Sequence, residues 1–86
     1  MPNVEEVKVH VAASVDQTQQ AVAGIRAVSD QLDEALTRLR LTAIGSVHPA
    51  VTNAIAQLEQ AKSRLDEAAT LARAAVDSAD AYRSIV

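Results

Sequence analysis

The segment Ala43-Ile44-Gly45-Ser46-Val47-His48-Pro49 interrupts an otherwise regular pattern of apolar residues near the middle of the 86-residue chain. Gly45 can adopt the left-handed backbone conformation that ends many helices. Pro49 suits the first turn of a new helix, because that turn does not use the N–H that proline lacks. We therefore predict a turn over about 44–48, determined by Gly45, Ser46 and Pro49, between one helix over about 4–43 and another over about 49–84.

The composition on both sides of this turn favours helix. The chain contains 18 alanines and only two glycines and two prolines, and Ala, Leu, Arg, Gln and Glu have a low conformational cost in helices. Asn3 followed by Glu6 has the form of a capping box, so the first helix is expected to begin near Val4. The alternation in 7–11 would also suit a half-buried strand, but such a strand would have no second strand to pair with.

Apolar residues recur at alternating steps of three and four in both predicted helices, which is the heptad pattern of helices that pack along a seam. In the first helix the expected seam comprises Val4, Val7, Val11, Ser14, Thr18, Ala21, Ile25, Val28, Leu32, Ala35 and Leu39. In the second helix it comprises Val51, Ala54, Leu58, Ala61, Leu65, Ala68, Ala72, Ala75, Ala79 and Tyr82. Ser14 and Thr18 are polar at expected core positions and are the candidates for control of pairing register.

A third apolar row runs beside each seam and consists of Val15, Val22, Leu36 and Ala43, and of Ile55, Ala69 and Val76. A stripe of this width suits a helix with two helical neighbours. We predict a single all-α domain, an antiparallel two-helix hairpin that pairs into a four-helix bundle with a second copy or a homologous hairpin. The expected core and interface residues are Val11, Val15, Val22, Ile25, Val28, Leu32, Leu36, Leu39, Ile55, Leu58, Leu65, Val76 and Tyr82.

Charge and composition exclude several classes of partner and site. The absence of Cys rules out disulfides and thiolate metal sites, and a formal charge of -3 leaves no basic face for nucleic acid. Apolar runs are too short for a membrane span, and acidic residues stand at positions 5 and 6, where a signal peptide would be basic. We expect a protein partner.

The polar residues suggest no catalytic, cofactor or metal site. His10 and His48 lack carboxylates at metal-ligand spacing, and His48 more simply caps the second helix or faces solvent. Adjacent acidic residues point about 100° apart on a helix, so the pairs at 5–6, 33–34 and 66–67 form no facing dyad. Ion pairs are expected at a spacing of four: Glu34 with Arg38, Arg26 with Asp30, Lys62 with Asp66, and Arg73 with Asp77.

Two enzyme-related patterns are weaker than their structural alternatives. Small helical chorismate mutases place several cations inside a bundle, but Arg38, Arg40 and Arg64 fall outside the expected core rows. Asp77-Ser78-Ala79 is similar to the phosphopantetheine site of carrier proteins, without their four-helix pattern.

The layout of two long helices about a central Gly turn resembles the WXG100 proteins of type VII secretion. In place of their Trp-x-Gly the chain has Ala43-Ile44-Gly45, and Val86 follows Tyr82 where the family's export signal has an acidic residue. Gly45-Ser46-Val47-His48-Pro49-Ala50-Val51 and Ala81-Tyr82 are also similar to amino-terminal helical segments of actinobacterial polymorphic toxins. These resemblances imply a non-enzymatic, dimerising adaptor or targeting module of a bacterial secretion or toxin system. They also imply a location in the bacterial cytoplasm or export without a cleaved signal peptide. A structural or regulatory scaffold without an export role is the main alternative, and a small mutase-type enzyme is a third.

Overall fold

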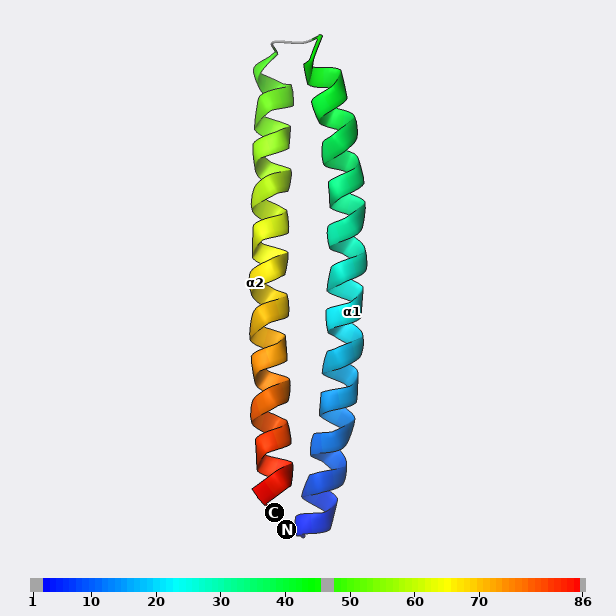
Figure 1. Ribbon diagram of the computed structural model, residues 1–86, viewed down its shortest axis with the longest axis vertical. Helices are drawn as coiled ribbons and strands as arrows, with labels where there is room; N and C mark the ends of the chain where they lie inside the picture. Colours follow the sequence, from blue (N-terminus) through cyan, green and yellow to red (C-terminus); the bar gives the residue numbers. More distant parts are fainter. Residues whose placement is uncertain (1–2, 46–47, 86) are drawn as a thin grey trace.

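The chain forms two α-helices that lie side by side along their length, with both ends of the chain at the same end of the molecule (Figure 1). The computed structural model describes residues 3–45 and 48–85. Helix α1 spans Val4–Ala43 and helix α2 spans Pro49–Ile85. Within the described ranges there is no strand, and the predicted all-α hairpin is confirmed.

Helix α1 begins with a cap formed by Asn3. The backbone of Asn3 is extended, and its side-chain Oδ1 accepts a hydrogen bond from the Glu6 N–H at 2.8 Å. This bond satisfies one of the N–H groups that the first turn of a helix leaves without a backbone partner. Glu5 and Glu6 place negative charge in the first turn, where the helix dipole favours it.

Helix α1 ends without the left-handed glycine that the sequence suggests. Ile44 keeps right-handed helical angles, and the Gly45 N–H donates to the Thr42 carbonyl, three residues back, at 3.3 Å. Gly45 does not have a positive φ, so it does not use the left-handed conformation that is open to it. The helix instead closes with a tight turn in which hydrogen bonds span three residues. Ser46, the second predicted turn residue, lies outside the described residues.

Helix α2 begins at Pro49, with His48 as its cap. The Ala50 N–H donates to Nδ1 of His48 at 3.1 Å, and the Val51 N–H donates to the His48 carbonyl at 3.1 Å. Two donors of the first turn are thereby satisfied by one residue, and Pro49 has no N–H to satisfy. Of the two roles weighed for His48, the ring takes the capping one.

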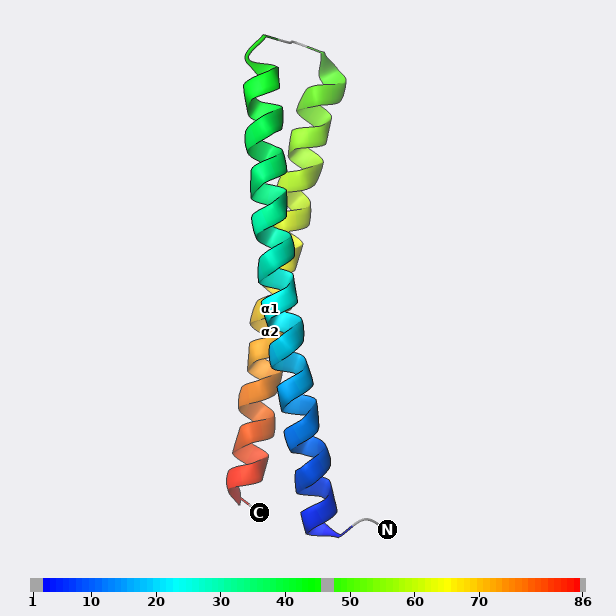
Figure 2. The same cartoon turned by 90° about the vertical axis from the view of Figure 1, so that its right-hand side faces the viewer.

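The hairpin is a thin rod. It measures 63 × 20 × 14 Å, and its radius of gyration is 19.3 Å, whereas a compact domain of this length has about 12 Å. Figure 2 shows the two helices crossing at a shallow angle, so that each contacts the other along one stripe. Among the described residues only Val15, Leu36, Ala69 and Val76 are buried.

The seam between the helices is marked by buried and half-buried side chains at heptad spacing. On α1 they are Val11, Val15, Thr18, Val22, Ile25, Ser29, Leu32, Leu36, Leu39 and Ala43. On α2 they are Val51, Ile55, Leu58, Lys62, Leu65, Ala69, Ala72, Val76 and Ala79.

One of the two rows in this seam differs from the sequence prediction in each helix. The row that the sequence suggested as a third one, which includes Val15 and Leu36 in α1, faces the other helix. The expected row of Ser14, Ala21 and Val28 is exposed. Both rows flank, at the same spacing, the row that the predicted and the observed seam have in common. We call it the shared row; it consists of Val11, Thr18, Ile25, Leu32 and Leu39 in α1 and of Val51, Leu58, Leu65, Ala72 and Ala79 in α2. A helix with a single neighbour buries more apolar area when the row with the larger side chains faces that neighbour.

Candidate protein-interaction surface

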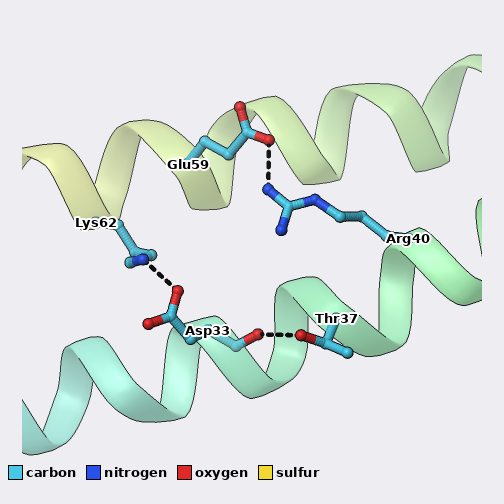
Figure 3. Close-up of polar contacts among 5 residues, drawn as sticks. All are labelled: Asp33, Thr37, Arg40, Glu59 and Lys62. Carbon is cyan, nitrogen blue, oxygen red and sulfur yellow. Dashed lines mark hydrogen bonds and ion pairs between the residues drawn. The ribbon is translucent and has the colours of Figure 1, made fainter.

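The seam divides the rest of the hairpin into two sides, and one of them carries ion pairs between the helices. Arg40 of α1 and Glu59 of α2 form a salt bridge of 2.8 Å, and Lys62 of α2 pairs with Asp33 of α1 (Figure 3). The backbone carbonyl of Asp33 also accepts a hydrogen bond from Thr37 Oγ1 at 3.0 Å. We call the surface on this side of the seam, with Arg26, Asp33 and Arg40 of α1 and Glu59, Asp66 and Arg73 of α2, the charged side.

Lys62 lies in the seam, in the row of Ile55, Ala69 and Val76, whereas the sequence prediction placed Ala61 in the seam and Lys62 in a surface ion pair. Its side chain is only 26% exposed, while that of Asp33 is 54% exposed. The expected pairing of Lys62 with Asp66 is therefore wrong, because the seam directs the ammonium group across to α1. The other three pairs expected at a spacing of four are likewise absent from the described residues, and the one pair within a helix joins Arg83 and Asp80 at 3.0 Å.

The middle of the charged side holds two arginines without ion-pair partners. Arg26 and Arg73 line a shallow hollow together with Asp66 and Thr70. Neither guanidinium is hydrogen-bonded to another described residue. Both arginines are exposed, so they stay solvated and the hollow offers no buried cation to hold an anionic substrate.

The other residues considered for chemistry are dispersed along the rod. Arg38, Arg40 and Arg64 are all exposed, and so are His10, Asp77 and Ser78. Within the described ranges, no three His, Cys, Asp or Glu side chains gather in a way that could hold a metal ion. Neither helix contains, in its described part, a stretch long and apolar enough to cross a membrane.

The opposite side of the seam is apolar. We call it the open face and define it by the two heptad rows that the hairpin leaves beside its seam: Ser14, Ala21, Val28 and Ala35 of α1, and Ala61, Ala68, Ala75 and Tyr82 of α2. Ala35 and Ala61 are half-buried and the other six are exposed, with Val28 at 45% and Tyr82 at 39%.

Helix geometry places these two rows on the same side of the hairpin. Residues of the charged side follow seam residues by one position, as Asp33 follows Leu32, whereas residues of the open face precede them, as Ala35 precedes Leu36. With 100° of rotation per residue, the two kinds of position flank opposite edges of the seam. Because the salt bridge of Arg40 with Glu59 shows that the charged rows of α1 and α2 share one side, the other two rows share the opposite side.

The structure thus separates the predicted core and interface residues into two groups. Val11, Val15, Val22, Ile25, Leu32, Leu36, Leu39, Ile55, Leu58, Leu65 and Val76 lie in the seam of the hairpin itself. Val28 and Tyr82 do not, since both stand on the open face. Leu71, which is 71% exposed, borders the same face between Ala68 and Ala75, and the sequence prediction missed it because it belongs to none of the three apolar rows.

Comparisons with protein-family models, curated proteins and solved structures found no match to this chain.

Proposed function

We propose that this chain is a non-enzymatic helical-hairpin module that pairs with another hairpin. We propose further that it acts as an adaptor or targeting piece in a bacterial secretion or toxin system, either in the cytoplasm or exported without a cleaved signal peptide. The pairing is supported by the shape of the hairpin. The assignment to such a system is supported by the resemblance of the layout to WXG100 proteins and of residues 45–51 to segments of polymorphic toxins.

The observation that carries the pairing is the amount of surface the hairpin leaves in water. The chain exposes 6309 Å². A compact protein of 9.1 kDa exposes about 4,900 Å², so the hairpin leaves about 1,400 Å² more in contact with solvent. The open face is part of this exposed surface, and most of its side chains are apolar. Covering such a face with another helical surface is favourable.

A second hairpin is the partner that suits this shape. In a two-helix rod each helix has one neighbour, whereas in a four-helix bundle each has two. The open face adjoins the seam on both helices, so a second hairpin placed there would extend the existing core instead of creating a separate one. In this arrangement the apolar rows that contain Ala21 and Ala68 would be covered by a helix of the second hairpin instead of by water.

Light scattering coupled to size exclusion, over a range of concentrations, tests the pairing. We expect a two-chain particle, with a thermal unfolding midpoint that rises with protein concentration because association is linked to folding. A dilute single chain that stays fully helical and unfolds at a concentration-independent temperature would remove the case for pairing.

Affinity purification from native extract tests the adaptor role. The bait is the tagged chain, and the control is an unrelated helical hairpin of the same length and charge. Enrichment of a homologous hairpin, a secretion component or a toxin over the control supports the adaptor. Recovery of untagged copies of the chain alone favours a structural scaffold and contradicts the adaptor.

A further inference from the structure

The hairpin gives no reason for a glycine in the middle of α1. Gly24 is near the midpoint of the helix, where glycine costs about 1 kcal/mol relative to alanine. Its φ is not positive, and a Cβ built on it would meet no atom within 4 Å. The absence of a side chain at this position therefore serves nothing inside the hairpin. It would matter if another backbone approached the helix there.

Gly24 lies at the edge of the open face. It stands three residues after Ala21 and four before Val28, so the three share one face of α1. On α2 the middle of the same face is formed by Ala68, close to the midpoint of Pro49–Ile85. Small residues at mid-length allow helix axes to come close. Val28 and Leu71 add apolar area near them, and Tyr82 adds apolar area near the end of α2; all three are substantially exposed.

The distribution of charge indicates what kind of surface could cover this face. The chain has eleven Asp and Glu residues. Among the described residues, none of them belongs to the open-face rows or to the positions that border those rows. The basic residues at its border are Arg38 and Arg64, and His10 also lies there. Such a face has no carboxylate row to attract a basic partner and no basic row to attract an acidic one, but it can meet a copy of itself without burying a charge.

The surface that the whole hairpin exposes in excess of a compact protein is larger than a dimer interface requires. A stable interface removes roughly 800 Å² from each partner, and the hairpin exposes about 1,400 Å² more than a compact protein of its mass. An interface that uses the same residues on both copies is also the commonest arrangement in homodimers.

We infer that a second copy of this chain docks on the open face, and that the two copies approach most closely at mid-length, near Gly24 and Ala68. This inference rests on the proposed pairing function and specifies its partner and its surface. The charged side stays in water in the dimer.

Matched alanine substitutions test the inference, because exposed alanines stand both on the open face and on the helix backs that point away from the seam. Ala21→Glu with Ala68→Glu introduces charges on the open face, and Ala27→Glu with Ala74→Glu introduces the same charges on exposed positions away from it. We expect the first pair to raise the dimer dissociation constant at least about 100-fold, since it buries unpaired carboxylates. The second pair should change it by less than about threefold. Sedimentation equilibrium gives both values, and circular dichroism shows that each variant remains helical.

Gly24→Ala separates close approach from simple burial. Within the hairpin the added methyl group meets open space and improves helix propensity, so helicity should be kept or increased. If a second backbone approaches Gly24, the same methyl group weakens the dimer, and we expect about a tenfold increase in its dissociation constant.

Cysteine labelling gives a second readout that tolerates a weak dimer, because the chain has no cysteine of its own. Under dimeric conditions a maleimide should modify Ala68→Cys at least about tenfold more slowly than Ala74→Cys, and dilution should remove the difference. If the Ala21→Glu, Ala68→Glu variant still dimerises and the two cysteine variants react at equal rates, the inference is wrong, but the pairing function is not contradicted. A wild-type chain that is monomeric at every concentration overturns the pairing function itself.

Discussion

Leu36→Ala should destabilise the hairpin more than any comparable change on its surface. Leu36 is 1% exposed, the most buried large side chain among the described residues. Leucine-to-alanine changes in protein cores cost about 2–5 kcal/mol, with the spread set by how far the neighbours can collapse into the cavity. Two helices can shift toward each other more easily than the walls of a globular core, so we expect a value of about 3 kcal/mol. For a domain of this size that loss lowers the melting temperature by about 12–24 °C.

Leu41→Ala is the matched control, because Leu41 stands on the same helix and its side chain is 65% exposed. Its substitution should change the free energy of unfolding by less than about 0.5 kcal/mol. Urea unfolding followed by circular dichroism measures both variants, at one protein concentration so that association affects them equally. Equal losses for the two variants, or a loss below about 1 kcal/mol for Leu36→Ala, would show that the seam is not the stabilising contact.

Three further changes test separate parts of the hairpin. Leu58→Asp should unfold the chain, because it puts an unpaired carboxylate into the seam; a circular dichroism spectrum like that of the wild type would contradict the position of Leu58. Lys62→Leu should raise the melting temperature, because an apolar side chain suits the seam and the ion pair with the half-exposed Asp33 contributes at most about 1 kcal/mol to stability. A lower melting temperature would mean that the ion pair stabilises the hairpin more than the apolar packing does. Asn3→Ala should cost about 1 kcal/mol through loss of the cap on the Glu6 N–H, whereas Asn3→Asp should restore most of it in the same urea titration; equal stability of Asn3→Ala and the wild type would show that the cap contributes nothing.

The positions where the helices start can be read from the sequence because the signals there are local. Asn3 with Glu6 at one end of α1, and His48 with Pro49 at the start of α2, each act through hydrogen bonds or ring geometry within one turn. Those interactions depend on a few neighbouring residues and on no distant part of the chain. The conformation of Gly45 was not predictable in the same way, because a glycine permits a left-handed conformation without requiring it.

The choice of seam could not be read from the sequence because it depends on the other helix. Val15 and Ser14 flank the shared row equally well, and only the area buried against α2 separates them. Thr18, a candidate for control of register, donates a hydrogen bond from its hydroxyl to the Ser14 carbonyl at 2.7 Å. Its hydroxyl therefore has a hydrogen-bond partner within α1. Heptad spacing places Lys62 in the same row as Ile55 and Ala69, which indicates a seam position. A lysine nevertheless favours a surface position, and only its partner Asp33 on α1 explains why it lies in the seam.

The unequal sides of the rod also bear on which of them a partner can cover. Closing two charged sides together would remove water from Arg26, Asp66 and Arg73, and the two arginines have no ion-pair partner among the described residues to offset that cost. Closing two open faces removes water mainly from alanine and valine side chains, from Ser14 and Tyr82, and from no carboxylate. The free energy of desolvation therefore favours contact through the open face even though its alanines bury little area each. In the dimer that we infer, small residues would let the helix backbones approach closely, which would give Gly24 a role that the isolated hairpin does not supply.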